Sequence, residues 1–203
     1  MRGFSSAVLS LAAMGLSTVT TYLTFFDARY TLTQAIADVP IQLQSGGGYS
    51  DGEADAYFRF FPTFDLILSN RGTRPVVVSD LEIYRSAAMD QCELTGEPMF
   101  MQDFQPVIVE PGTVSPFSVE VSLPNLERSA RDGEAFDLSG EEALYCFQWT
   151  LFDPNGRRHE PIAEALTVRY TLLPPPEGER YPDINVEKDF PRRPERLISR
   201  GFF

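Results

Sequence analysis

The side chains best suited to chemistry lie in one short stretch, MDQCELTGEPMFM, at positions 89–101. It contains Cys92, one of the two cysteines in the chain, together with three methionines: Met89, Met99 and Met101. Thiolate and thioether sulfurs suit Cu(I), so convergence of these four side chains would form a copper site. The other cysteine is Cys146, and an even number of cysteines in an exported domain favours a disulfide. We therefore expect a Cys92–Cys146 disulfide and no metal, and keep a Met/Cys copper loop as the alternative.

Other patterns that could support catalysis are incomplete. The single histidine, His159, follows two arginines in a charged turn, and no G-x-S-x-G nucleophile elbow is present. Asp51, Glu53 and Asp55 have the spacing of the start of a calcium loop. An alanine and a proline then stand where an EF-hand requires glycine and glutamate. We therefore predict a protein that is not an enzyme and has no cofactor.

Composition narrows the class of partner. The formal net charge is −12, and phosphate binding needs a basic surface, so we expect no nucleic-acid partner. Hydrophobic residues make up 43% of the chain, which is enough for a substantial core. The 16 prolines and 14 glycines favour many turns over long helices.

An uncharged run from Ser5 to Phe26 predicts a transmembrane helix, because about 20 apolar residues cross a bilayer. Arg2 precedes the run, so the positive-inside rule places residues 1–4 in the cytoplasm and the remainder outside. Residues 27–38 would be a connector. The alternative is a signal peptide cleaved after Ala35-Ile36-Ala37. Both interpretations place the main domain outside the cytoplasm, and the lack of N-x-S/T sequons fits a bacterial periplasm and inner membrane.

The predicted helix carries a stripe of small and hydroxyl side chains at alternating spacings of four and three residues. They are Ser6, Ser10, Ala13, Ser17, Thr20 and Thr24. At this spacing they share one helix face, where a second transmembrane helix can approach closely and accept hydrogen bonds. The other possibility is a solitary anchor whose hydroxyls bond to their own helix. We favour a helix-packing surface that contacts an integral membrane complex in the lipid bilayer.

Residues 39–173 alternate with a period of two, which predicts β-strands. About seven strands are expected, at 39–44, 64–70, 76–84, 106–109, 117–123, 143–152 and 163–173. The stretch SGGGYSDGEADA, residues 45–56, is expected to be a flexible acidic loop, and 85–105 and 124–142 are expected to be irregular. Strands of this length and spacing predict an all-β antiparallel sandwich.

The pattern resembles immunoglobulin-like and fibronectin-like sandwiches, in part because Trp149 lies beside Cys146 on a central strand. It departs from antibody domains because Leu144 stands two residues before Cys146, where that family has a tyrosine. One helix followed by such a domain is also similar in layout to membrane-anchored copper-assembly factors of the oxidase pathway. Those proteins have closely paired cysteines, whereas Cys146 stands alone.

The tail, residues 174–203, begins with a proline run and is expected to be extended and irregular. Its end combines basic and apolar residues: Arg192, Arg193, Arg196, Leu197, Ile198, Arg200, Phe202 and Phe203. A segment of this kind can dock on a partner, fold back on its own acidic domain, or contact anionic lipid. We favour partner docking, and hence an accessory or assembly subunit of a bacterial membrane complex, with a membrane-anchored copper chaperone as the alternative.

Overall fold

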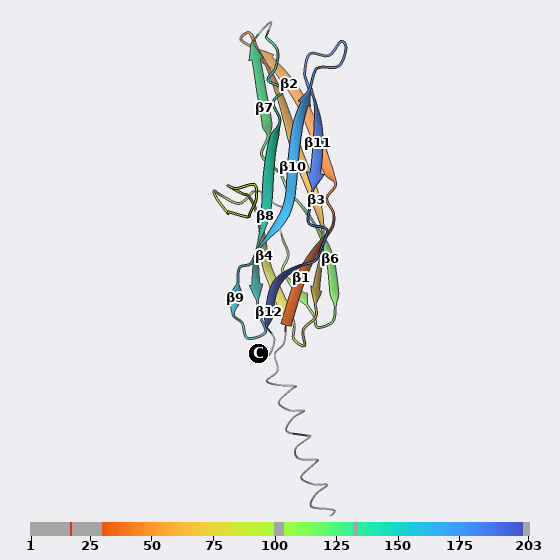
Figure 1. The fold of residues 1–203 in the computed structure, drawn as a ribbon, viewed down its shortest axis with the longest axis vertical. Helices are drawn as coiled ribbons and strands as arrows, with labels where there is room; N and C mark the ends of the chain where they lie inside the picture. Colours follow the sequence, from red (N-terminus) through yellow and green to blue (C-terminus); the bar gives the residue numbers. More distant parts are fainter. Residues whose placement is uncertain (1–16, 18–29, 100–103, 132–133, 201–203) are drawn as a thin grey trace, which may run out of the picture.

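The computed structural model describes Ser17 and residues 30–99, 104–131 and 134–200. Twelve strands in these residues form two six-stranded antiparallel sheets that face each other as a sandwich (Figure 1). In chain order they are β1 (Tyr30–Asp38), β2 (Ile41–Ser50), β3 (Glu53–Asn70), β4 (Val76–Arg85), β5 (Val107–Val109), β6 (Val114–Glu120), β7 (Leu126–Arg131), β8 (Glu141–Phe152), β9 (Arg158–His159), β10 (Ile162–Leu173), β11 (Asp183–Asp189) and β12 (Glu195–Arg200). The predicted all-β sandwich is confirmed, with more strands than the sequence pattern indicated.

The first sheet is built around β3, which at 18 residues is long enough to pair with two strands along each edge. β1 and β2 follow one another along one edge, and β6 and β7 along the other. Pro40 lies between β1 and β2. Hydrogen bonding to β3 continues across it, because the Pro40 carbonyl accepts a 2.8 Å hydrogen bond from the Thr63 amide. β12 lies outside β1 and completes the sheet.

The second sheet has the order β11-β10-β8-β4-β5, with β9 paired to β8. Alternate side chains of both sheets point inward, and Phe64 of the first sheet meets Phe147 of the second edge-to-face at 4.9 Å. Trp149, also on β8, is fully buried between the sheets. Burial of large aromatic rings is the main stabilising contribution to such a core.

The sandwich is elongated, and its two ends differ (Figure 1). Tyr30 pairs with Arg200, so the segments before residue 30 and after residue 200 leave from the same end. We call this end the chain-end pole. The opposite end, the hairpin pole, carries the β2–β3 turn, the end of β7 and the β10–β11 loop.

The expected connector at 27–38 is wrong for its described part, because β1 begins at Tyr30. β1 pairs with β3 on one side and β12 on the other, and it buries Leu32 and Ile36 in the core. The proposed signal-peptide site at Ala35-Ile36-Ala37 lies inside this strand. Cleavage there would remove most of a strand that lies between two others.

The expected acidic loop at 45–56 is also wrong. β2 and β3 form a continuous hairpin through this stretch, with Asp51 and Gly52 as its two-residue turn. Both turn residues have positive φ, 52° and 83°, as a type I′ turn requires. The glycine run suggested a loop, but the ring of Tyr57 lies over Gly46 and the ring of Tyr181 lies over Gly47. The glycines are therefore tolerated in a strand because aromatic rings occupy the space of their missing side chains.

The irregular tail is the third correction. Residues 183–189 and 195–200 form β11 and β12, which extend the second and first sheets respectively. The proline-rich stretch after Leu173 is a loop, because proline cannot continue the β10 ladder. Residues 190–194, between β11 and β12, are also outside the strands. The predicted loop at 124–142 likewise contains β7, whose charged sequence LERSAR concealed its pairing with β3.

The predicted span at 5–26 lies outside the described residues except for Ser17, so the stripe of small residues stays a prediction. Among the described residues, the structure contains no helix that is long and apolar enough to cross a membrane.

Candidate docking surface

The two cysteines form a disulfide, as predicted, with sulfurs 2.03 Å apart. It joins the loop between β4 and β5 to β8. Cys92 therefore offers no thiolate, Met99 packs against the core, and Met89 is 47% exposed. Met101 lies outside the described residues. No group of three His, Cys, Asp or Glu side chains in the described part of the chain is arranged to hold a metal ion. The alternative of a copper site therefore lacks its thiolate ligand, because the Cys92 sulfur is held in the disulfide.

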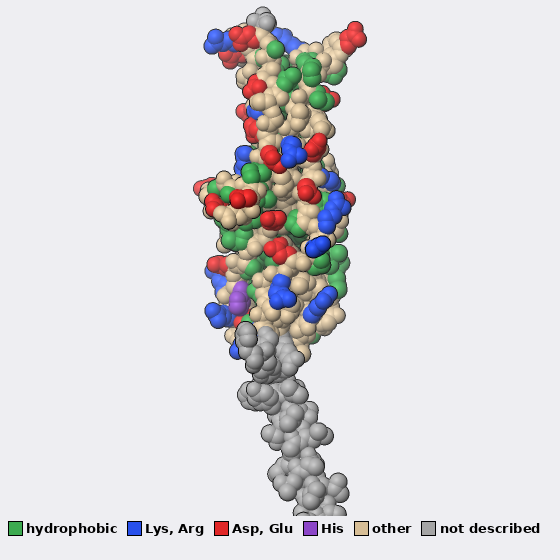
Figure 2. All heavy atoms as spheres, in the orientation of Figure 1, with side chains coloured by type: hydrophobic (Ala, Val, Ile, Leu, Met, Phe, Trp, Pro, Cys, Tyr) green, Lys and Arg blue, Asp and Glu red, His purple; other side chains and the backbone are tan. Residues whose placement is uncertain are grey.

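The predicted docking residues of the tail separate into two sets. Leu197 and Ile198 are only 7% and 8% exposed, so they are core residues of β12 and cannot anchor a partner. The four arginines, Arg192, Arg193, Arg196 and Arg200, remain exposed. Figure 2 shows Lys and Arg side chains over the lower half of the molecule, where β1 and β12 lie. Phe202 and Phe203 are outside the described residues.

A buried carboxylate ties β1 to the β8–β9 turn at the chain-end pole. Oδ2 of Asp153 accepts a 3.0 Å hydrogen bond from the Tyr30 hydroxyl and lies 3.1 Å from Nε2 of His159. Its Oδ1 accepts the backbone amides of Asn155 and Arg157. Burial alone would raise the pKa of Asp153, but these hydrogen bonds outweigh it and lower the pKa to about 2. His159, which the sequence places in a charged turn, is therefore part of a structural clamp.

A second polar connection crosses the sandwich. The indole Nε1 of Trp149 donates a 2.7 Å hydrogen bond to Gln34, whose amide nitrogen lies 3.3 Å from a Glu195 carboxylate oxygen. Burial raises the pKa of Glu195. These three residues come from β8, β1 and β12, so the connection fixes the register of the tail strand against both sheets.

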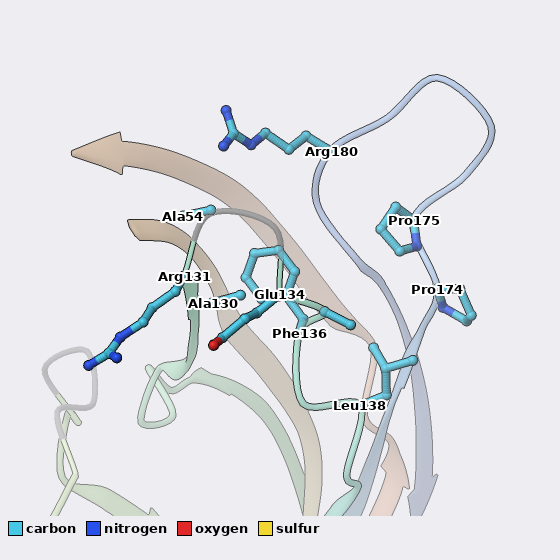
Figure 3. Close-up of a pocket in the computed structure, with 10 residues that line it drawn as sticks. Ala54, Ala130, Arg131, Glu134, Phe136, Leu138, Pro174, Pro175 and Arg180 are labelled. Atoms are coloured by element: carbon cyan, nitrogen blue, oxygen red, sulfur yellow. The ribbon is translucent and has the colours of Figure 1, made fainter. Parts of the chain in front are cut away.

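The hairpin pole contains an apolar cavity of about 330 Å³ (Figure 3). Its lining comes from the β2–β3 hairpin, β7, the segment before β8 and the β10–β11 loop: Ala54, Ala130, Arg131, Glu134, Ala135, Phe136, Leu138, Pro174, Pro175 and Arg180. The cavity exists because Ala54 and Ala130, paired across β3 and β7, are too small to fill the space between the sheets. Figure 3 shows Phe136 and Leu138 on one wall and the two prolines beside them.

The chemistry of this cavity suits binding. Among the described residues, its lining has no hydroxyl, thiol or imidazole group, and Glu134 is the one carboxylate. Arg131 points away from the cavity in Figure 3, and the Arg180 guanidinium stacks on the Tyr49 ring at 4.0 Å. An apolar recess with charged residues at its rim is typical of a site for a protruding apolar side chain.

A second groove of about 400 Å³ lies beside β2, between this strand and the start of β11. Phe58 and Tyr181 contribute aromatic surface, and Glu179 and Asp183 contribute negative charge. The Tyr181 ring packs on Phe136 of the apolar cavity at 6.3 Å. The two recesses therefore share the β10–β11 loop as a common wall, and together they form the candidate docking surface.

Sequence reasoning missed this surface because its parts are far apart in the chain. By local pattern alone, the proline run predicts the start of an irregular tail, and the glycine run predicts a loop. A usable signal was present: aromatic Tyr49, Tyr57 and Tyr181 flank segments that otherwise look like linkers. Linkers rarely need several large rings.

No family model matches this chain. A stretch of 79 residues is 35% identical to the nitrate reductase-like protein NarX of Mycobacterium tuberculosis, in two strains. The match covers 36% of this chain and 12% of the NarX length. The match thus spans only a small part of that relative and about a third of this chain.

Proposed function

We propose that this protein is a single-pass accessory or assembly subunit of a bacterial membrane protein complex, without enzymatic activity of its own. Residues 5–26 would anchor it in the inner membrane, and the sandwich would lie in the periplasm. The observation that carries the proposal is the separation of the two poles. Both chain ends leave at one pole, and the apolar cavity and open groove lie at the other.

This arrangement supports a module that presents a binding surface at a distance from the bilayer. The chain-end pole would face the membrane, where the exposed arginines of β12 add attraction to anionic headgroups of about 1 kcal/mol each. The integration of β1 into the first sheet favours a retained anchor over a cleaved signal peptide. Removal of residues up to Ala37 would take away Leu32, Gln34 and Ile36 together.

The strand order also supports the proposal that the sandwich is of the immunoglobulin-like type. The β1-β3-β6 group opposite β5-β4-β8-β10 matches the arrangement of strands A, B and E opposite C′, C, F and G. The disulfide differs from that family, since Cys92 comes from a loop instead of the strand corresponding to B. Sandwiches of this kind serve many binding roles, so the argument for function rests on the surface and not on the fold.

The test is purification of the tagged full chain from its own membranes in a mild detergent. The expected result is a complex in which another integral membrane protein is present at a fixed ratio. Leu138→Lys places a charge in the apolar cavity and should release that protein. Asn125→Lys, an exposed position between β6 and β7, should leave the complex intact. A chain that purifies alone and monomeric refutes the proposal.

A further inference from the structure

The open edges of the two sheets are protected in every case but one. Unpaired strand edges attract other strands, and proteins block them with charge, proline or short length. Among the described strands, β6 carries Pro116, β7 Arg128, β11 Lys188 and β12 Arg196, while β5 has three residues and β9 two. β2 pairs only with β3, is ten residues long, and contains neither charge nor proline.

The hydrogen-bonding direction of β2 follows from its neighbour. The carbonyls of Phe60 and Pro62 accept the amides of Leu123 and Val121, on the side of β3 away from β2. The odd-numbered residues of β3 therefore face β2, and their antiparallel partners are the even-numbered residues 42–50. The alternate positions direct their backbone N–H and C=O groups outward: Ile41, Leu43, Ser45, Gly47 and Tyr49.

The inner side chains of this edge are also incompletely covered. Leu43 and Tyr49 share the inner face with their buried partners Phe60 and Ala54, yet they are 42% and 48% exposed. The reason is that the second sheet ends at β11, which is not hydrogen-bonded to β2. One more strand beside β2 would cover both side chains and satisfy the open backbone groups.

The groove between β2 and the start of β11 carries two acidic side chains. Tyr181 lies over Gly47, which holds the start of β11 close to β2 at the hairpin pole. Near the middle of the molecule, the Lys188 ammonium bonds to the Val39 carbonyl. The charged residues in the described lining of the groove are Glu179 and Asp183, and the Arg180 guanidinium is held beside it on the Tyr49 ring. A strand entering here would meet negative charge on its inward side.

We propose that the β2 edge binds an extended segment of the partner complex, which pairs as an additional strand of the first sheet and directs a lysine or arginine toward Glu179 and Asp183. The backbone ladder would supply affinity and the acidic groove would supply selectivity. This inference rests on the proposed function, because it names the kind of segment that the partner contributes.

A second copy of this chain is the competing occupant, and the geometry disfavours it. β2 runs from the middle of the molecule to the hairpin pole (Figure 1). Antiparallel pairing of β2 with itself would reverse one copy, so the two chain-end poles would point in opposite directions. Two copies anchored in one membrane cannot adopt that arrangement. A parallel pair related by a two-fold axis also fails. In a parallel ladder, the residues whose N–H and C=O groups face the partner are staggered between the two strands, whereas the symmetry would place them at the same height.

The test is site-specific photocross-linking of the full chain in its own membranes. A benzoylphenylalanine in place of Gln44 lies on the outer face of the β2 edge, and one in place of Glu127 serves as the control on the β7 edge. The expected adduct forms only from position 44. It maps by mass spectrometry to one extended, lysine- or arginine-containing segment of the protein that co-purifies.

Matched variants then test the pairing. Leu43→Lys adds an inward charge at the edge and should lower the adduct yield by about tenfold, the change that 1.4 kcal/mol of lost binding produces. Gln42→Lys adds the same charge on the outer face and should leave the yield unchanged. Adducts to a second copy, to lipid, or equally from both positions overturn the inference. If the complex co-purifies but position 44 gives no adduct, this inference fails and the proposed function stands. If no protein co-purifies, both fail.

Discussion

Replacing Asp153 with asparagine should weaken the fold by a pH-dependent amount. The carboxylate is 6% exposed and accepts hydrogen bonds from the Tyr30 hydroxyl, the His159 ring and the amides of Asn155 and Arg157. These hydrogen bonds outweigh the opposing effect of burial and lower its pKa from 3.8 to about 2. Asparagine keeps the shape and removes the charge.

The magnitude follows from the linkage of protonation to folding. A lowering by nearly two pKa units contributes about 2 kcal/mol to the free energy of unfolding. Because the folded-state pKa is the lower one, this contribution is complete above pH 4 and is lost as the pH falls toward 2. The stability difference between the wild type and Asp153→Asn should therefore be about 2 kcal/mol at neutral pH and should shrink below pH 4.

The assay is urea unfolding of the full chain in detergent micelles, followed by tryptophan emission. Trp149 is the only tryptophan and is fully buried, so its emission reports the core between the sheets. Glu127→Gln removes an exposed carboxylate and should change stability little at any pH. A difference for Asp153→Asn that stays constant from pH 6 to 2, or that is below about 0.5 kcal/mol at neutral pH, refutes the linkage argument.

Two further predictions concern the disulfide and the glycine run. Replacing Cys92 and Cys146 with alanine removes a disulfide that joins residues 54 positions apart. The same urea assay should show that the free energy of unfolding falls by about 4 kcal/mol, the value that the chain-entropy model gives. An unchanged unfolding midpoint would contradict this prediction. Gly47→Ala places a methyl group 2.5 Å from the Tyr181 ring and should cost about 1–3 kcal/mol, whereas Gly48→Ala, with open space around it, should be close to neutral. Equal stability of the two alanine variants would show that Tyr181 does not need the glycine.

Much of the domain was predictable because its signals are local. The alternation in FSVEVSL and ALYCFQWTLF predicts strands that the structure contains. The turn sequence DPNG ends β8 where expected. Two cysteines in a domain that the sequence predicts to lie outside the cytoplasm predict a disulfide, and one is present. Each of these inferences depends on a few neighbouring residues or on a count.

The candidate docking surface could not be predicted in this way. Its open edge, β2, runs through three glycines, a composition that usually indicates a loop. The strand exists because Tyr57 comes from its hairpin partner and Tyr181 from a segment more than 130 residues away. The contact between Tyr181 and Gly47 cannot be inferred from the local sequence around either residue.

The chain's own sequence thus determined the class of fold, the cysteine pairing and the acidic net charge. Tertiary structure alone decided the fate of the tail. Its proline run and charged strands give little local preference, but β10 and β1 each present an open edge that needs a partner. Backbone groups left unpaired beside a core are costly, and the entropy of closing a long loop grows only slowly with its length. The tail therefore folds back to form β11 and β12, and Asp153 finds Tyr30 across 123 residues.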